Sequence, residues 1–131
     1  MTVKEVTTKK ERREFFRFPL KLYKGNAYAV PQLISDENDE FNPAVNDAYS
    51  YAESKMFLCY DDNGKVVGRI AAILNKAYNA KQNVKQLRFS RYDVIDDFAV
   101  TEALFEPVKK WAEELGMDEI VGPIGFSDLD K

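Results

Sequence analysis

Residues 85–124 read KQLRFSRYDVIDDFAVTEALFEPVKKWAEELGMDEIVGPI, and this stretch decides the fold. Residues 85–92 predict a strand, residues 93–97 predict a turn, and residues 98–115 predict an amphipathic helix. Residues 119–124 then predict a second strand. A strand–helix–strand unit requires a sheet around it, because parallel strands are buried on both faces. The stretch therefore predicts an α/β (α+β) architecture.

The predicted helix carries one apolar stripe at spacings of four, three and four residues: Leu104, Val108, Trp111 and Leu115. Pro107 falls inside this pattern, and an interior proline removes a hydrogen bond. The stripe begins before the proline, so we expect one helix kinked near Pro107. Gly116 follows as the residue expected just past a helix C-terminus.

The chain upstream of this unit begins with a short strand candidate at residues 3–6. Thr7 or Thr8 offers a hydroxyl to cap a helix beginning at Lys9, and Glu11 stands at capping-box spacing from Thr8. Pro19 is expected to kink or end that helix.

A hairpin is the clearest local prediction. Residues 56–60 and 65–74 predict paired strands, and Asn63-Gly64 is expected to supply the positive φ angles of the turn between them. Gly68 interrupts the second strand, which predicts a bulge or a close approach by another backbone.

The remaining segments give weaker signals. Residues 27–35 predict an extended apolar segment, and residues 36–40 predict a solvated acidic loop rather than a cation site. Residues 47–53 predict one or two helical turns, and residues 75–83 predict a connection between strands.

Composition sets the class of protein. The 131 residues are 45% hydrophobic and 31% charged, which is ordinary for a single soluble domain, and no apolar run is long enough to cross a membrane. The N-terminus lacks the apolar core of a signal peptide, and Cys59 is the only cysteine, so we expect a reducing, cytoplasmic location. Histidine is absent, which excludes His-dependent triads and His-ligated metals within one chain.

Charge is unevenly distributed. Residues 1–25 carry eight Lys/Arg against three Glu, whereas residues 26–62 carry eight Asp/Glu against one Lys. A nucleic-acid interface would use the cations of the first helix: Lys9, Lys10, Arg12, Arg13 and Arg17. The net charge of -3 opposes sequence-independent binding, so a solvated helix face is the favoured interpretation.

The order of elements resembles the first two thirds of the acyl-CoA N-acyltransferase fold of the GNAT superfamily, and more narrowly a group of bacterial GNAT-like proteins. Four segments carry the resemblance: Phe15-Phe16-Arg17-Phe18-Pro19 with Leu22-Tyr23, Val30-Pro31-Gln32-Leu33, Val67-Gly68-Arg69-Ile70, and Gly116-Met117 leading to Gly122-Pro123. It implies a mixed sheet with an N-terminal helical segment, an antiparallel hairpin and a strand–helix–strand unit, in a single GNAT-like domain over residues 1–131.

The resemblance implies a site for acetyl-CoA or another acyl-CoA where strand 85–92 and the last strand splay apart. On this basis we expect the cofactor to contact Val94, Ile95, Val100 and Thr101. Typical members bind the pyrophosphate with a glycine-rich turn that carries a basic residue. Here the turn has no glycine and three carboxylates, so Asp96 and Asp97 are expected to occupy the anion position as helix caps.

No catalytic residue is assigned. Asp93 stands where a base would sit, and Tyr92 or Tyr51 would be a proton donor, but core roles are favoured for the aromatic residues. Cys59 is expected to be a buried core residue rather than a nucleophile.

Typical members continue with a further helix and two strands, so the sequence predicts an incomplete C-terminal part and a homodimer formed through the unfinished sheet. Two functions stay open: an N-acyltransferase-like domain acting on an unknown amine, not competent as this isolated chain, and a non-catalytic, self-associating interaction module.

Overall fold

A computed structural model of the chain describes residues 1–22 and 38–126. In that part of the chain, one mixed sheet contains its strands in sequence order: β1 (Thr2–Glu5), β2 (Ala52–Tyr60), β3 (Val66–Asn75), β4 (Gln86–Val94) and β5 (Glu119–Val121). Strands β1 to β4 pair antiparallel, and β4 pairs parallel with β5. The predicted mixed α/β architecture is confirmed.

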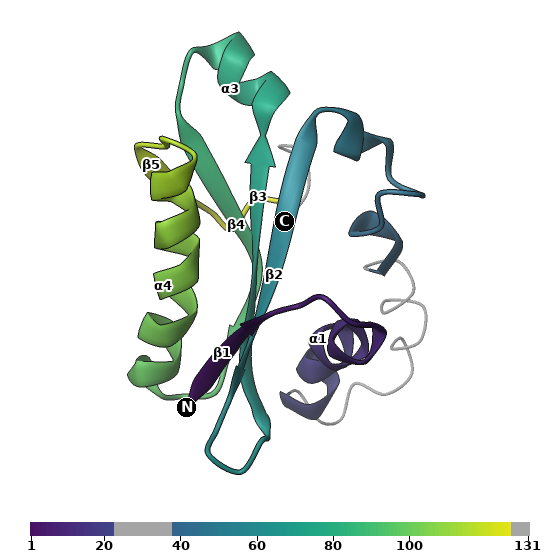
Figure 1. Ribbon diagram of the computed structural model, residues 1–131, viewed down its shortest axis with the longest axis vertical. Coiled ribbons are helices and arrows are strands. Elements are labelled where there is room, and N and C mark those ends of the chain that lie inside the picture. Colours follow the sequence, from purple (N-terminus) through teal and green to yellow (C-terminus); the bar gives the residue numbers. More distant parts are fainter. Residues whose placement is uncertain (23–37, 127–131) are drawn as a thin grey trace.

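The helices lie on both faces of this sheet: α1 (Lys9–Leu22), the 3₁₀ turn η1 (Asp47–Ser50), α3 (Lys76–Gln82) and α4 (Phe98–Glu114). Helix α4 covers one face and α1 lies over the other (Figure 1). The described helices include none long and apolar enough to cross a membrane.

The two long helices begin as expected. At α1 the capping box is confirmed: Glu11 N donates to Thr8 Oγ1 at 3.1 Å, and Thr8 N donates to Glu11 Oε1 at 3.0 Å. The backbone N–H groups of Thr7 and Thr8 hold the pKa of Glu11 below its ordinary value. Pro19 stays inside α1, and Pro107 stays inside one uninterrupted α4.

Helix α4 packs its apolar stripe on the sheet. Val100, Leu104 and Val108 are at most 1% exposed and form one core with side chains of β2, β3 and β4. A Cβ at Gly68 would lie 2.8 Å from both Leu104 Cδ1 and Val100 Cγ1. The bulge predicted at Gly68 is confirmed beside it, since Cys59 pairs with Gly68 but Tyr60 pairs with Val66. The close approach is also present, but the approaching atoms are side chains rather than a backbone.

The other face carries a second, largely aromatic core: Phe15, Phe16, Phe41, Ala48, Ala52, Met56, Leu58, Ala71, Ile73 and Phe126. Two of its ring pairs meet edge-on, Phe15–Phe16 and Phe41–Phe126, each with centroids 5.2 Å apart. Each face of the sheet thus has its own hydrophobic core.

Three local predictions need correction. In the hairpin loop only Gly64 has a positive φ (79°), and Asn63 does not. The loop is a turn followed by one left-handed residue, and the strand pairing shifts register at Tyr60. Residues 76–82 form helix α3. Asn75 caps its N-terminus, where Asn75 Oδ1 accepts from Tyr78 N at 2.9 Å. The last strand ends at Val121 rather than at residue 124.

Other boundaries shift by a few residues. Strand β4 extends to Val94, so the predicted turn shortens to residues 95–97, and β1 covers residues 2–5. The helical turns predicted at 47–53 end at Ser50, and residues 38–40 are helical rather than a solvated loop. The extended segment predicted at 27–35 lies outside the described residues, as do residues 36 and 37.

Candidate functional site

Strands β4 and β5 separate after a short parallel pairing. Residues 86–88 of β4 pair with residues 119–121 of β5, and β4 then continues to Val94 while β5 ends. The chain after β5 still contacts β4: Ile124 N donates to Phe89 O at 2.9 Å, and Arg88 Nη1 donates to Gly125 O at 3.2 Å. The two strands therefore separate beside Phe89, next to α4.

A bulge lies in β4 just beyond that point. Ala71 of β3 pairs with Ser90 and Arg69 pairs with Asp93, so the register shifts between them, and Arg91 takes a φ of 51°. Bulges redirect side chains and are common beside functional sites. This bulge turns the second half of β4 toward the N-terminus of α4, where the Tyr92 and Thr101 hydroxyls are 2.6 Å apart.

The four residues expected to contact an acyl-CoA lie around this end of α4, but not all in one cavity. Ile95 and Val100 line a cavity of about 180 Å³. Val94 is in β4, paired with Gly68, and packs against the core beneath α4. Thr101 is tied to Tyr92.

Carboxylates dominate that small cavity. Asp61, Asp62 and Asp97 line it, together with Met1, whose amino group binds Asp62 and lowers the pKa of that carboxyl. Asp97 caps α4 by accepting from Ala99 N at 3.0 Å, as predicted, whereas Asp96 precedes the cap and is not the capping residue. Both side chains are exposed. The helix N-terminus is thus already neutralised by a side chain of the protein.

Asp93, the residue placed where a base would sit, is paired with a buried cation. Its Oδ2 lies 2.9 Å from Arg69 Nε and 2.8 Å from Arg69 Nη2, and Arg69 is 3% exposed. Arg69 also donates to Phe15 O at 3.1 Å, which joins the pair to α1. Asp93 therefore links β3, β4 and α1 structurally.

Tyr51, the other donor considered, is remote from Asp93. It precedes β2, whose first residue pairs with Asn75 at one end of β3, whereas Asp93 pairs with Arg69 near the other end. The structure does not bring Tyr51 and Asp93 into one site.

Two further arginines of β4 were not anticipated. Arg88 is 2% exposed, donates to Gly125 O at 3.2 Å and lies 4.5 Å from the Tyr78 ring centroid. Arg91 binds Glu40 and lies over Phe41. In the sequence they stand three residues apart, which is not the alternate spacing of one strand face, so strand periodicity does not mark them as a pair.

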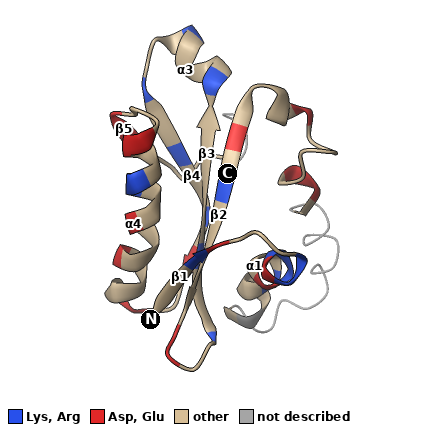
Figure 2. Cartoon of the chain, in the orientation of Figure 1, with Lys and Arg blue, Asp and Glu red and all other residues tan. Residues whose placement is uncertain are grey.

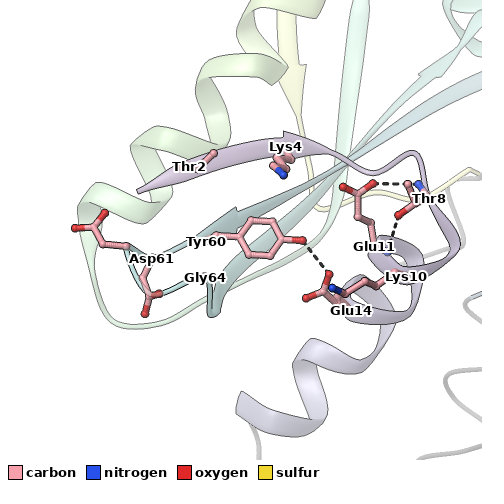
Figure 3. Close-up of a pocket in the computed structure, with 10 residues that line it drawn as sticks. Thr2, Lys4, Thr8, Lys10, Glu11, Glu14, Tyr60, Asp61 and Gly64 are labelled. Carbon is pink, nitrogen blue, oxygen red and sulfur yellow. Dashed lines mark hydrogen bonds between the residues drawn. The ribbon is translucent and has the colours of Figure 1, made fainter.

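A larger cleft, of about 580 Å³, shares Asp61 and Asp62 with the small cavity at the α4 N-terminus. Figure 3 shows it between β1, the hairpin turn and the start of α1. Inside it, Tyr60 donates to Glu14 Oε1 at 3.0 Å, and burial together with that carboxylate raises the pKa of Tyr60 to about 12. Its residues come from two distant segments, 2–14 and 60–64, which is why no single sequence motif marks it.

The other groups considered as reactive are the Cys59 thiol and possible metal ligands. Cys59 is buried in β2, and burial raises the pKa of its thiol, as suits a core residue. Within residues 1–22 and 38–126, no three His, Cys, Asp or Glu side chains gather in a way that would hold a metal ion.

Comparison with known proteins gives one sequence relative and several structures of similar fold. No protein-family model matches the sequence. Protein YghO of Escherichia coli K12 is 26% identical over 125 residues, covering 95% of this chain but 32% of YghO. The chain therefore spans about a third of the length of that curated relative.

Solved structures agree on the fold. A proposed acetyl transferase from Pyrococcus furiosus superposes with a TM-score of 0.58 at 16% identity, covering 94% of this chain and 83% of that one. A GNAT-family acetyltransferase from Staphylococcus aureus gives 0.55 at 15% identity, covering 91% and 71%. A ribosomal-protein-alanine N-acetyltransferase from Brucella melitensis gives 0.55 at 17% identity, covering 92% and 78%. The chain has the GNAT fold.

Proposed function

We propose that this chain of GNAT fold is an acyl-CoA N-acyltransferase-related domain that is not a competent enzyme on its own. The observation that carries the proposal is the separation of β4 from β5 beside the N-terminus of α4. An acetyl-CoA or other acyl-CoA would lie in that separation, near Val94, Ile95, Val100 and Thr101. A reducing, cytoplasmic location stays a prediction of the sequence.

The chemistry explains why the isolated chain is expected to be inactive. In acyl transfer an amine attacks the thioester carbonyl, a C–N bond forms, the C–S bond breaks, and the thiolate leaves. A base must take a proton from the amine, and an acid must protonate the thiolate. Of the nearest titratable groups, Asp93 pairs with Arg69 and Tyr92 with Thr101. We therefore propose that this domain acts within a longer protein. The rest of that protein would complete the binding site for the acceptor, an amine.

Electrostatics oppose the cofactor at the α4 N-terminus. A diphosphate there would meet the carboxylates of Asp97 and Asp61, and that of Asp62, which is paired with the Met1 amino group. Two like unit charges 4 Å apart repel by about 1 kcal/mol in water and about 4 kcal/mol at an effective dielectric of 20. We propose that this repulsion weakens cofactor binding without abolishing the shape of the site.

Neutralising the turn tests this proposal. In the double variant D96N/D97N, asparagine caps a helix as well as aspartate does, so the fold is expected to persist. Acetyl-CoA should bind at least about tenfold more tightly, because two repulsive charges are lost. Calorimetric titration of both proteins measures the change, with circular dichroism to verify folding.

A matched control removes two carboxylates elsewhere on α4. E113Q/E114Q makes the same change in net charge near the other end of the helix, where both side chains are exposed. It should leave the affinity within about twofold of the wild type, because exposed charges farther apart than a Debye length of roughly 10 Å are largely screened. Equal affinities for D96N/D97N and wild type, with both folded, would refute the inhibitory role of the turn.

A second candidate function is a non-catalytic, self-associating interaction module. It is favoured by a partly unpaired strand edge: beyond Arg88, the described residues provide β4 with a ladder partner only in β3, apart from the Ile124–Phe89 bond. Unpaired strand edges invite pairing with another chain. Light scattering should then give twice the mass of one chain at concentrations above about micromolar, a typical range for weak association. A single-chain mass throughout would rule this candidate out.

A further inference from the structure

Helix α1 carries three exposed cations on one face. Lys10, Arg13 and Arg17 follow one another at spacings of three and four residues, which places them side by side along the helix. Figure 2 shows the blue of lysine and arginine on this helix, on the face of the sheet opposite α4. These cations line a groove of about 260 Å³, together with Glu14, Phe18 and Val66. The groove thus has a cationic rim and an apolar floor.

The acidic residues of α1 that lie near these cations are engaged elsewhere. Glu14 stands four residues after Lys10 and three before Arg17, where a helix would let it pair with either, yet its Oε1 accepts from Tyr60 at 3.0 Å. Glu11 is held by the N–H groups that it caps. Among the described residues, none forms a salt bridge with the three rim cations. The Glu14 carboxylate lines the same groove, so among the described residues one carboxylate there faces three cations.

We propose that this groove binds a small phosphate ester, with the phosphoryl oxygens on Lys10, Arg13 and Arg17 and the organic substituent over Phe18 and Val66. Two arginine forks match phosphate oxygens in pairs, and a lysine adds a point charge. The volume is below the range of about 300–1,000 Å³ that is typical of larger ligands, which favours a compact monoester. The partly exposed Val66, beside the edge of the largely buried Phe18, gives the substituent an apolar surface to cover.

The surroundings of the groove distinguish this ligand from a nucleic acid. The adjoining cleft shares Lys10 and Glu14 with the groove, and it is lined by four carboxylates: Glu11, Glu14, Asp61 and Asp62. A long polyanion extending from the groove would meet all four, whereas a monoester would meet Glu14 alone, the one carboxylate among the described residues that lines the groove itself. The groove also lies across the sheet from α4, so its occupancy is independent of the acyl-CoA proposal (Figure 1).

The test uses phenyl phosphate as the probe, in calorimetric titrations of the whole chain. Wild-type protein should bind it with a Kd below about 1 mM, and R13Q/R17Q should bind at least about tenfold more weakly. Glutamine keeps the helix propensity of arginine at these exposed positions, so the variant should fold. The matched control K109Q/K110Q removes two exposed cations from α4 and should stay within about twofold of the wild type.

Three results would overturn the proposal. The first is equal affinity of wild type and R13Q/R17Q for phenyl phosphate. The second is equal affinity of the wild type for phenyl phosphate and inorganic phosphate, which would remove the role of Phe18 and Val66. The third is an eight-nucleotide single strand that displaces phenyl phosphate and binds more tightly, with strong salt dependence, which would make the groove a polyanion site. The probe contains no coenzyme A, so none of these results bears on acyl-CoA binding.

Discussion

Replacing Arg69 by methionine should lower the free energy of unfolding by about 3–5 kcal/mol, the range for a buried ion pair that loses one partner. Arg69 is 3% exposed, and its guanidinium binds Asp93 through two nitrogens. Methionine fills much of the same space but leaves the carboxylate in a largely buried position without this cation. It also removes the donor to Phe15 O, which joins α1 to the sheet. Urea denaturation followed by circular dichroism measures the loss.

Two comparison variants test whether the cost of R69M comes from leaving a charge buried or simply from losing an ion pair. Lys76 and Glu53 form a pair at 3.6 Å whose side chains are both more than half exposed. K76M should therefore cost less than about 1 kcal/mol. The double variant R69M/D93L removes both buried charges and should recover most of the loss. If R69M proves no more costly than K76M, the buried pair is not a major contributor to the fold.

Replacing Gly122 by alanine should also destabilise the protein, by an amount near the upper end of the overpacking range of about 1–3 kcal/mol. A Cβ there would lie 2.4 Å from Phe89 O and 2.8 Å from Phe89 Cδ1. The obstructing atom is a backbone carbonyl of β4, which cannot turn aside as a flexible side chain does. The segment after β5 must then move away from β4, and the Ile124 N–Phe89 O bond of 2.9 Å should break.

Hydrogen exchange gives the specific readout. The Ile124 amide should lose protection in G122A, because its acceptor is displaced. In the control G64A the new Cβ meets nothing within 4 Å, and the cost comes from the positive φ of 79° in the hairpin turn. G64A should therefore lose some stability and leave Ile124 protected. Unchanged Ile124 exchange in G122A would show that the close approach does not fix this segment.

Residues with a strong local signal predicted their elements correctly. The stripe of Leu104, Val108 and Trp111 packs on the sheet as expected, because helical periodicity depends only on neighbours along the chain. The capping box of α1 follows equally from residues three apart. The GNAT arrangement of the sheet needed the resemblance, since strand order is set by long-range pairing that no local pattern encodes.

Helix α3 escaped prediction because its residues carry no apolar stripe. None of its seven residues is buried, so burial left no periodic mark on the sequence. The signals present were Asn75 as an N-cap and Asn83, which ends the helix at a φ of 54°. Both are asparagines, which also favour turns, so they are ambiguous without the structure.

The site was predictable only in part. Asp97 was identified as a cap because a carboxylate just before a helix has a local role. The pairing of Asp93 with Arg69 joins residues 24 positions apart on neighbouring strands, and it depends on the bulge at Arg91. Nothing in the sequence fixes that bulge, because Arg91 takes a positive φ that arginine rarely adopts. Long-range register, not residue type, limited the prediction.

The most direct test of the account is an acetyl-CoA titration of the ¹⁵N-labelled chain, followed amide by amide by NMR. We expect weak binding, with shift changes that concentrate at Val94, Ile95, Val100 and Thr101 and leave the amides of α1 unmoved. Shift changes confined to α1, or a well-folded spectrum that does not change at millimolar acetyl-CoA, would contradict the assignment of this domain to acyl-CoA chemistry.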